Sequence, residues 1–428
     1  MTSLSDWLQR LETLHPAPMA LGLDRLSPVF QKLNPDLSAA KVITVAGTNG
    51  KGSVVELLQN LLLSAGHRVG LYTSPHLLRY NERVRVNGVE LDDETIIAGF
   101  EAVERCRSDI ALTYFEFSTL AALYNFAQAK LDYVILEVGL GGRLDAVNIV
   151  DPDLCVLTSV ALDHEAWLGN DREQIGAEKA GIFRPGVPVV CGDSEPPESV
   201  LNRVNELACP YYHCGEDFAL QQSESGGALW WGRSRGGSRR EVHYKGPLHL
   251  LPVNIACALQ VYWLLKDDAP PDWSALSSTV PGRQEHLNFE GIDIILDVAH
   301  NPAASEALAR HLQQLPPVER CCALFAVMAD KEIDGMVAAL KDSFHAWFLG
   351  DLTGNPRAKP ARDLAPLLHA QGISMISVSK NMRQTFARAM SLLEPGHRLV
   401  VFGSVFTVAA IKTILEQKLS RQDLEGEI

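Results

Sequence analysis

The segment with the clearest chemistry is Gly47-Thr48-Asn49-Gly50-Lys51-Gly52-Ser53. It follows an apolar run at 42–45 that predicts a strand, and it opens a helical stretch at 53–65. In this setting backbone N–H groups and the helix dipole can converge on phosphate oxygens. Glycine lets the main chain approach closely, Lys51 supplies positive charge to the β and γ oxygens, and Ser53 offers a hydroxyl near a metal. The segment therefore predicts a nucleotide phosphate-binding loop.

The loop departs from the standard spacing of such motifs. Val45 stands where the first glycine would lie, and Gly52 separates Lys51 from the hydroxyl residue. A glycine-rich turn that arose by chance is the alternative interpretation. The order of strand, loop and helix favours the phosphate-binding one.

Two polar residues follow apolar, strand-like runs further along the chain. Glu137 ends the run at 133–136, and His164 lies just beyond the run at 156–160. Open parallel sheets bind ligands at the carboxyl ends of their strands, so both side chains are candidates for a magnesium site. Taken alone, Glu137 could equally cap a helix or form an ion pair. His164 could be a hydrogen-bonded structural residue, since magnesium usually takes oxygen ligands.

The order of the elements predicts an α/β protein. Strand-like runs alternate with helical stretches, which is typical of βα units around a mostly parallel sheet. After Gly291 the rhythm restarts, with expected strands at 292–298, 321–327, 347–349, 373–378 and 399–402. We therefore expect an N-terminal domain at 1–285 and a smaller α/β domain at 286–428, divided where turn residues interrupt the pattern at 284–288. A segment rich in glycine, serine and arginine at 223–237 is expected to form an exposed, β-like excursion or hairpin.

The composition limits the class of protein. Of 428 residues, 46% are hydrophobic and 21% are charged, which is typical of a globular chain with two or three packing units. A formal net charge of -14 argues against a broad nucleic-acid-binding face. The start, MTSLSDWLQRLETL, lacks the pattern of a signal peptide, and no apolar run approaches the about 18–20 residues that cross a bilayer. We expect a cytoplasmic protein with no nucleic-acid or membrane partner.

The cysteines do not suggest a disulfide framework. All eight are scattered, and Cys321-Cys322 lie in an apolar run as buried thiols do. Cys209 and Cys214 flank His213, but no second ligand pair with zinc spacing follows, which argues against a structural zinc site.

Six short motifs occur in order along the chain. They are VAGTNGKGS at 45–53, TSPH at 73–76, EVGLGGRLD at 137–145, DH at 163–164, EKAG at 178–181 and DVAHNP at 297–302. Together they resemble the bacterial folylpolyglutamate synthases of the Mur ligase superfamily, and most closely those that are also dihydrofolate synthases. The resemblance runs from about residue 20 to about residue 410. It implies a P-loop-type, mostly parallel N-terminal sheet domain followed by a Rossmann-like C-terminal domain.

The resemblance implies how a metal site is built. Ser74, Glu137 and His164 would bind two magnesium ions, and Lys179 would be carbamylated, which adds a carboxylate to the second metal site. From the residues alone, Lys179 is predicted to be an ordinary exposed helix residue paired with Glu178.

The resemblance also implies an ATP site that draws on both domains. Beside the loop at 47–53, Asn254, Arg283 and Asp297 match positions that hold ATP, with Asp297 reaching from the C-terminal domain towards the ribose. From spacing alone, Asp297 could equally cap the helix that follows Pro302.

Three segments resemble the dihydropteroate-binding segments of the bifunctional enzymes. They supply the expected substrate contacts Gly22, Leu23, Asp24, Arg25, Thr113, Phe115, Leu144, Asp145 and Ala146. An aromatic face and hydrogen-bonding carboxylates suit a flat heterocycle. Core packing is the alternative for Tyr114 and Phe115, and a solvated strand face is the alternative for Arg83 and Arg85.

Two places depart from the family pattern. In the run Gly403-Ser404-Val405-Phe406-Thr407, Phe406 stands where close members carry histidine, whereas Ser404 matches. The region 191–250 shows little resemblance beyond its general pattern.

The function that the resemblance implies is ATP-dependent addition of L-glutamate to dihydropteroate and to reduced folates. A free carboxylate must first be activated, because hydroxide is a poor leaving group, and transfer of the γ-phosphate of ATP gives an acyl phosphate. Lys51, Lys179 and His300 are the catalytic candidates, and His300, which would face the phosphates, is assigned no proton transfer. Because an acyl phosphate hydrolyses when water enters, nucleotide contacts from two domains predict domain closure. We expect the chain to act as a monomer.

Two other functions are weighed against this one. A ligase of the same superfamily that adds amino acids to a cell-wall nucleotide precursor would share the phosphate-binding loop, but not the pterin-type segments at 22–25 and 112–116. A nucleotide-gated binding protein or switch would lack the coupled turnover that the carboxylates and Lys179 predict.

Overall fold

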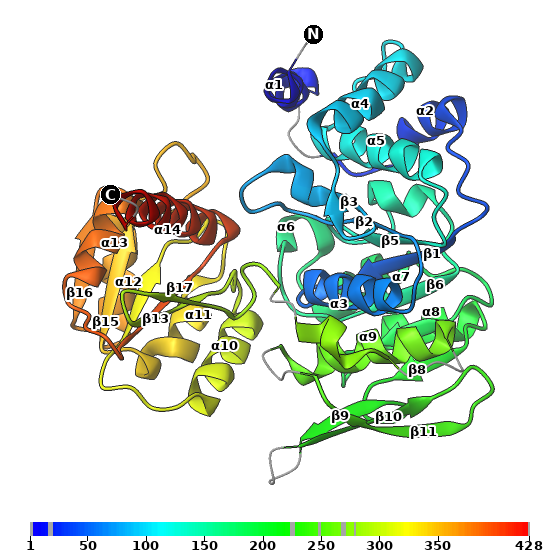
Figure 1. The fold of residues 1–428 in the computed structure, drawn as a ribbon. Coiled ribbons are helices and arrows are strands. Elements are labelled where there is room, and N and C mark those ends of the chain that lie inside the picture. The colour runs from blue at the N-terminus through cyan, green and yellow to red at the C-terminus, as the bar shows by residue number, and fades with distance from the viewer. Residues whose placement is uncertain are drawn as a thin grey trace. The chain divides into compact units, whose positions relative to one another are not determined.

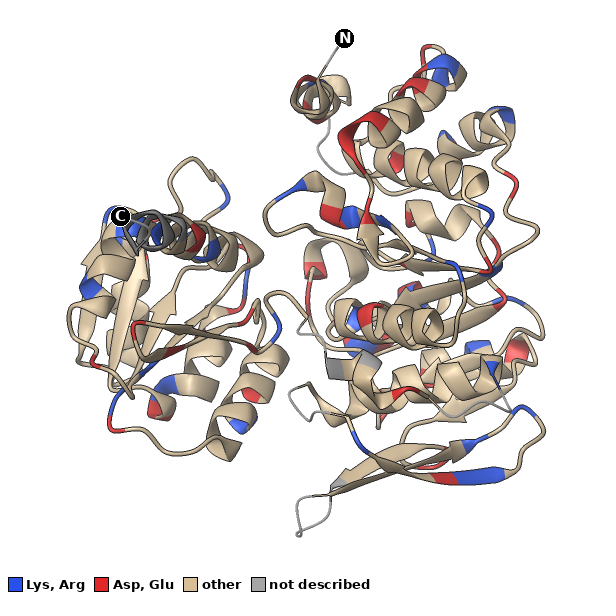
Figure 2. Cartoon of the chain, in the orientation of Figure 1, with Lys and Arg blue, Asp and Glu red and all other residues tan. Residues whose placement is uncertain are grey.

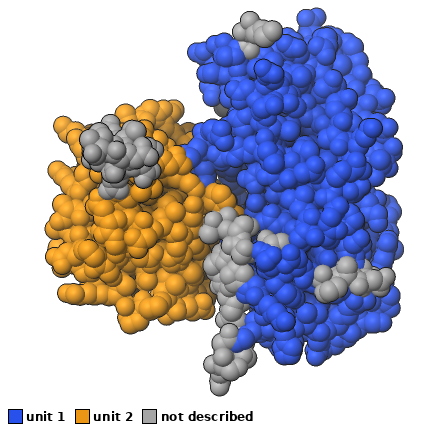
Figure 3. Space-filling model, viewed as in Figure 1, with its two compact units in different colours: residues 1–278 blue, residues 279–428 orange. Residues whose placement is uncertain are grey.

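The computed structural model describes residues 3–15, 20–222, 227–246, 250–266, 271–277 and 280–426. Each of two parts of the chain is an α/β structure around its own main sheet (Figure 1). These compact units are residues 1–278 and residues 279–428 (Figure 3). The division lies upstream of the 285/286 boundary expected from the sequence, because Glu285 already pairs with Leu296 inside the C-terminal unit.

The N-terminal unit is built on an eight-stranded sheet. In spatial order its strands are β4 (Val89–Glu90), β3 (Val84–Val86), β2 (Val69–Tyr72), β5 (Tyr133–Glu137), β1 (Lys41–Ala46), β6 (Leu154–Leu157), β7 (Val189–Cys191) and β8 (Tyr211–His213). The strands from β2 to β8 in this order run parallel, and β3 and β4 add an antiparallel edge. β2, β5 and β6 are buried along their whole length, which explains their continuous apolar runs. The predicted mostly parallel sheet is confirmed.

Helices surround this sheet. They are α1 (Leu4–Leu14), α2 (Leu26–Leu33), α3 (Lys51–Ser64), α4 (Asp93–Arg107), α5 (Tyr114–Gln128), α6 (Glu165–Leu168), α7 (Arg172–Ala180), α8 (Glu198–Glu206) and α9 (Pro252–Leu265), with short 3-10 turns η1 (Tyr80–Arg83), η2 (Ala146–Ile149) and η3 (Trp273–Ser277). α1, α2, α4 and α5 share one hydrophobic cluster, which includes Leu11, Leu26, Phe100 and Phe117. α3 lies against β1, β2 and β5 and also contacts α9.

A three-stranded antiparallel sheet follows in the region that shows little family resemblance. It consists of β11 (Arg239–Tyr244), β10 (Ala228–Arg233) and β9 (Ala219–Gln222). The predicted hairpin at 223–237 is confirmed as β-structure, although residues 223–226 lie outside the described residues. The expectation that it is exposed throughout is wrong, because Trp230 is fully buried and stacks on Trp263 of α9 with ring centroids 6.0 Å apart.

The C-terminal unit has a six-stranded sheet. Its order is β12 (Glu285–Phe289), β13 (Ile292–Leu296), β17 (Arg398–Phe402), β14 (Cys321–Phe325), β15 (Ala346–Gly350) and β16 (Ile376–Ser379), and only β12 runs antiparallel to its neighbour. The helices are α10 (Pro302–Gln314), α11 (Ile333–Leu340), α12 (Ala361–Ala370), α13 (Met382–Met390) and α14 (Val405–Gly426), with the 3-10 turn η4 (Lys341–Ser343). The five predicted strands are confirmed. β12 was missed because only Leu287 and Phe289 of its five residues are apolar, and one of its two buried residues is the charged Glu285.

Most charged side chains of both units lie on the surface, apart from buried ones such as Glu137, Lys179 and Asp297, and most large apolar side chains lie inside. Cys321 and Cys322 are buried free thiols, and an aromatic cluster of Phe325, Trp347 and Phe402 fills the C-terminal core. Lys and Arg are interspersed with Asp and Glu over both units (Figure 2). In the part of the chain that the structure describes, every helix is too short or too polar to cross a membrane.

Candidate active site

The loops that follow four neighbouring strands of the N-terminal sheet form the candidate active site. β2, β5, β1 and β6 are adjacent and parallel, so their carboxyl ends open on the same edge. The loop at 47–50 follows β1, Ser74 follows β2, Glu137 ends β5, and His164 lies in the loop after β6. The candidate phosphate and metal groups, which are dispersed in the sequence, therefore gather at one edge of the sheet.

The candidate phosphate-binding loop joins β1 to α3. Gly50 is the N-cap residue of α3 with a φ of 90°, a left-handed conformation that glycine adopts without strain. Gly50 supplies no side-chain cap, so the N–H groups of the first turn present a positive helix end that suits an anion. Lys51 Nζ donates to the carbonyl oxygens of Gly47 at 2.9 Å and Thr48 at 3.2 Å, which holds the ammonium against the loop.

Side chains from the loop after β6 fix the path of the phosphate-binding loop. Thr158 Oγ1 donates to the carbonyl oxygen of Asn49 at 2.7 Å, and Ser159 Oγ accepts from the Asn49 N–H at 3.0 Å. The Thr48 N–H donates to the Ser159 carbonyl oxygen at 2.8 Å. A Cβ at Gly47 would collide with Thr158 Oγ1, so only glycine fits there. Sequence inspection missed Thr158 and Ser159, since hydroxyl residues after a strand carry no distinctive signal.

Asn254 on α9 also lies beside this loop. A Cβ at Gly50 would collide with the side-chain oxygen of Asn254, so the two residues pack directly against each other. Ser53, the hydroxyl expected near a metal, is buried in the first turn of α3. The structure thus places both residues within the site that the sequence suggested.

Two of the three candidate metal ligands, Ser74 and Glu137, are joined by a hydrogen bond. Glu137, a buried residue, accepts from the Thr73 hydroxyl and, at 3.2 Å, from the Ser74 N–H. His164 has a left-handed φ of 54°, and its Nε2 lies 3.9 Å from Asp163 Oδ2. Thr73 and Asp163 were not among the candidates, although each adjoins one in its motif.

A carboxylate, a hydroxyl and an imidazole suit a divalent cation when phosphate oxygens complete its coordination. Within the described ranges, no group of three or more His, Cys, Asp or Glu side chains could hold a metal ion unaided.

Lys179 is buried in α7, with only 3% of its surface exposed, so the expectation of an exposed helix residue is wrong. Its neighbour Glu178 pairs instead with Arg143, at 2.7 Å between Oε1 and Nη2. The glycine-rich loop after β5 packs closely on the backbone of α7, because a Cβ at Gly142 would lie 2.8 Å from the carbonyl oxygen of Lys179. This loop is distant in sequence, so spacing along α7 could not reveal it.

The surroundings of Lys179 change its chemistry. The pKa of its amine is lowered to about 7, chiefly by burial and also by the Lys51 ammonium, while the carboxylates of Asp163 and Asp145 oppose the shift. An amine with this pKa is largely an uncharged nucleophile at slightly alkaline pH, unlike an ordinary surface lysine.

The three pterin-type segments meet within the N-terminal unit. The Gly22 N–H donates to the Leu144 carbonyl oxygen at 3.2 Å, and Arg25 Nε donates to Glu116 Oε2 at 3.0 Å. The Glu116 carboxylate is buried and also accepts the Thr113 N–H at 2.8 Å. These contacts join segments that are far apart in the sequence, and Glu116 belongs to the pterin-type segment at 112–116.

The residues of these segments differ in exposure. Leu23, Asp24, Arg25 and Leu144 keep accessible surface, whereas the side chains of Thr113, Asp145 and Ala146 are buried. Thr113 caps α5 and Asp145 caps η2. Burial raises the pKa of Asp145 to about 6, although hydrogen bonds from backbone N–H groups oppose the shift. Direct substrate contacts by these buried side chains stay a prediction.

The aromatic residues beside these segments serve partly as packing. Phe115 is half-buried against both hydrophobic clusters of the unit. Arg83 is buried, with its Nε donating to His76 Nδ1 at 2.8 Å and its guanidinium 5.5 Å from the Tyr114 ring. Arg85 pairs with Glu56 at 2.7 Å, and both side chains are largely buried. The alternative that Arg83 and Arg85 lie on a solvated strand face is therefore wrong.

The C-terminal unit carries the other candidate nucleotide contacts. Asp297 follows β13, and its carboxylate accepts from the Gln284 N–H at 3.1 Å and the Ala299 N–H at 2.7 Å. The cap of α10 is Asn301, which accepts from the Ala304 N–H at 2.9 Å, so the capping alternative for Asp297 is wrong.

Arg283 and His300 lie close enough to Asp297 to influence it. Burial raises the pKa of Asp297, and the nearby Arg283 and His300 oppose this shift. His300 Nδ1 lies 2.9 Å from the Val298 carbonyl oxygen, which fixes the orientation of the ring. The three candidates of this unit therefore form one cluster at the end of β13.

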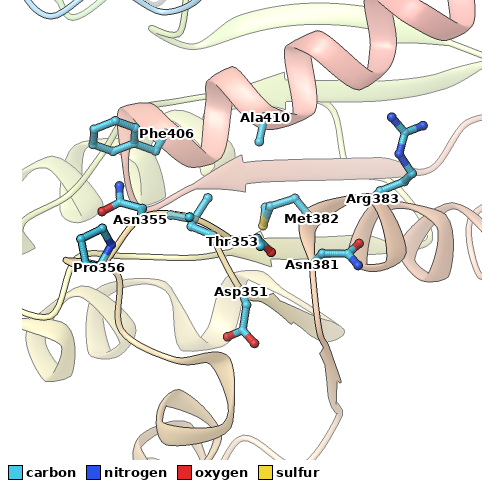
Figure 4. A pocket seen from close by; sticks show the side chains of 11 residues that line it. Asp351, Thr353, Asn355, Pro356, Asn381, Met382, Arg383, Phe406 and Ala410 are labelled. Carbon is cyan, nitrogen blue, oxygen red and sulfur yellow. The ribbon is translucent and has the colours of Figure 1, made fainter. Parts of the chain in front are cut away.

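A pocket of about 890 Å³ opens elsewhere in the C-terminal unit, at the carboxyl ends of β15 and β16. Phe406 lies on the side of the pocket near Asn355 and Pro356, and Arg383 lies on the opposite side (Figure 4). Phe406 is 48% exposed, whereas Ser404 is buried and bonds the Thr407 hydroxyl at 2.7 Å. The departure from the family pattern therefore changes the wall of a pocket and leaves the core intact.

The Mur ligase middle domain family matches residues 45–219, and the family described as Mur ligase, glutamate ligase domain matches residues 282–405. The chain is 41% identical over 422 residues to the dihydrofolate synthase/folylpolyglutamate synthase of Escherichia coli (strain K12), covering 97% of this chain and 96% of that protein. It is 37% identical to the enzyme of the same name from Haemophilus influenzae, covering 96% of this chain and 98% of that one.

Solved structures agree with the sequence matches. E. coli FolC in complex with DHPP and ADP has a TM-score of 0.90 at 38% identity, covering 97% of this chain and 98% of that chain. A bifunctional folylpolyglutamate synthase/dihydrofolate synthase with Mn, AMPPNP and L-glutamate bound has a TM-score of 0.87 at 40% identity. The match covers 97% of this chain and 98% of that chain. These matches favour the folate ligase over the cell-wall ligase and over a switch without ligase chemistry. The chain belongs to the dihydrofolate synthase/folylpolyglutamate synthase family of Mur ligases, which are ATP-dependent ligases.

Proposed function

We propose that this ligase adds L-glutamate to dihydropteroate, forming dihydrofolate, and to reduced folates, forming folylpolyglutamates. The observation that carries the proposal is the gathering of the phosphate-binding loop, Glu137 and Lys179 around one sheet edge, in a unit that also joins the pterin-type segments. The DHPP, ADP, AMPPNP, Mn and L-glutamate held by related structures support a folate-type acceptor, a nucleotide, a divalent cation and glutamate as ligands. Glutamate incorporation into each acceptor, identified by product mass, tests the assignment.

The proposed reaction has two steps. The substrate carboxylate attacks the γ-phosphorus of ATP, the bond to the bridging oxygen breaks, and ADP and an acyl phosphate form. Lys51 and the N–H groups at the start of α3 stabilise the negative charge on the transferring oxygens. The glutamate amine then attacks the acyl carbon, loses a proton, and the tetrahedral intermediate collapses to the amide with release of phosphate.

We propose that nucleotide contacts from both units exclude water from this intermediate. Asn254 adjoins the phosphate-binding loop in the N-terminal unit, and Arg283 and Asp297 adjoin each other in the C-terminal unit. A nucleotide held by both sets would shield the acyl phosphate from water and so protect it from hydrolysis.

Ser74, Glu137 and His164 would hold magnesium ions, and we propose two of them. Bound at this edge, magnesium would neutralise charge on the phosphate oxygens and so assist their transfer. Lys179, as a carbamate, would add a carboxylate near Lys51. This carboxylate forms when the uncharged amine nitrogen bonds to the carbon of CO₂ and loses a proton.

Replacing His164 with alanine should raise the magnesium concentration needed for half-maximal activity by about tenfold, because one ligand is lost. Activity is titrated with magnesium at saturating substrates. His243→Ala is the matched control, since His243 is exposed on β11, away from this sheet edge. An unchanged magnesium titration in His164→Ala would remove this residue from the metal site.

We further propose that the enzyme is monomeric and cytoplasmic. The eight cysteines are free thiols, as is usual in a reducing compartment.

A further inference from the structure

The first turn of the C-terminal unit is held in place by three separate contacts. The Val298 N–H donates to the Gly282 carbonyl oxygen at 2.9 Å, and the Gln284 N–H donates to Asp297 at 3.1 Å. On the opposite side, the Gly282 N–H donates to Glu285 Oε2 at 2.8 Å. Arg283 lies at the centre of this turn, so these contacts fix the backbone that presents its guanidinium.

The turn needs such support because its backbone is strained. Gln284 has a φ of 47°, a left-handed conformation that side chains other than glycine rarely adopt. Conformations of this kind persist only where surrounding contacts impose them. Gln284 and Glu285 are both buried, with 7% and 6% of their surface exposed. Weakening one contact should therefore let the turn relax to a different backbone path.

One of these contacts depends on a residue of the last helix. Lys412 of α14 donates to Glu285 Oε1 at 2.6 Å, while Glu285 Oε2 receives the Gly282 N–H. The two side chains are only 19% and 7% exposed. A buried carboxylate is costly unless it is paired, so Lys412 compensates the burial of Glu285 and orients it towards the turn.

We propose that Glu285 and Lys412 are positioning residues for nucleotide binding. Lys412 orients Glu285, Glu285 holds the Gly282 N–H, and the turn thereby presents Arg283 beside Asp297. Neither residue touches the nucleotide in this account. The inference rests on the proposed function, because it takes Arg283 and Asp297 to be nucleotide contacts.

The test compares steady-state constants of Lys412→Met with those of the unaltered chain. We expect the KM for ATP to rise about tenfold, with kcat within about twofold and the KM for glutamate and for dihydropteroate unchanged. A merely structural role would not single out one substrate. Lys412→Arg, which keeps the charge, should restore the KM for ATP, and an unchanged KM for ATP in Lys412→Met would overturn the positioning role.

Lys418→Met is the matched control on the same helix. Lys418 contacts β12 through the Phe289 ring, 5.9 Å away, and lies on the exposed side of α14. Its substitution should leave all constants unchanged, and a rise like that of Lys412→Met would overturn the inference by showing a general effect of the helix. If Lys412→Met fails to fold, the double variant Glu285→Gln/Lys412→Met, which removes both charges together, is measured instead. Its KM for ATP should also rise about tenfold, and an unchanged value would overturn the positioning role.

Arg283→Ala separates this inference from the function on which it rests. A raised KM for ATP in Arg283→Ala together with a raised value in Lys412→Met supports the inference. A raised value in Arg283→Ala alone overturns only the positioning role of Lys412. An unchanged value in Arg283→Ala overturns the nucleotide contact itself, while ligase activity of the unaltered chain would still stand as a separate measurement.

Discussion

Replacing Lys51 with alanine will lower ATP-dependent glutamate incorporation by about a thousandfold or more. The ammonium is the positive charge held against the phosphate-binding loop, through the carbonyl oxygens of Gly47 and Thr48. Charges placed where negative charge develops in phosphoryl transfer contribute effects of roughly this size. The measurement is the initial rate of radiolabelled glutamate incorporation at saturating ATP.

Lys41→Ala is the matched control for this substitution. Lys41 begins β1, the strand that leads into the same loop, and its side chain is exposed. Its loss should leave the rate near that of the unaltered chain. Near-normal turnover in Lys51→Ala would contradict the assignment of the phosphate-binding loop, provided that thermal unfolding shows both variants to be folded.

Replacing Lys179 with alanine or arginine should lower the same rate by about a hundredfold or more, because neither side chain can carry the proposed carbamate. The arginine variant keeps a positive charge, so its inactivity would show that the charge alone does not suffice. Glu178→Gln is the control, since Glu178 lies next along α7 and pairs with Arg143 away from the buried amine. Full activity in Lys179→Arg would contradict the proposal.

The carbamate also predicts a pH dependence. Burial lowers the pKa of Lys179 to about 7, so the uncharged amine that reacts with CO₂ becomes scarce as the pH falls below about 7. A lysine at its usual pKa near 10.4 would be almost wholly protonated across this range. In the presence of ¹³C-bicarbonate, a carbamate signal in the NMR spectrum should grow from about pH 6 to about pH 8 and be absent in Lys179→Arg. No signal at any of these pH values would contradict carbamylation.

Much of the fold could be predicted because its strands are buried on both faces. Runs such as those of β5 and β6 are apolar throughout, and their alternation with helices indicates a parallel sheet. β12 could not be recognised in this way. It pairs on one side only, and the buried Glu285 is explained by an ion pair with Lys412, far away in the sequence.

In the candidate site, too, features built from residues that are contiguous in the sequence could be predicted, whereas features built from distant residues could not. The phosphate-binding loop was recognisable because a strand, glycines, a lysine and a helix are contiguous. The loop around Gly142 packs on the backbone of α7 at Lys179, and the phosphate-binding loop is supported by hydrogen bonds from Thr158 and Ser159. None of these contacts leaves a periodic signal, so only the three-dimensional arrangement reveals them.

The most direct test of the ligase assignment supplies the chain with ATP, magnesium and L-glutamate together with one acceptor at a time, and identifies the products by mass. With dihydropteroate we expect dihydrofolate, and with tetrahydrofolate we expect a product one glutamate heavier, each formed with stoichiometric ADP. A UDP-sugar peptide precursor should give no product. Amide formation on the UDP-sugar peptide alone, or ADP release with no amide product from either folate acceptor, would contradict the account.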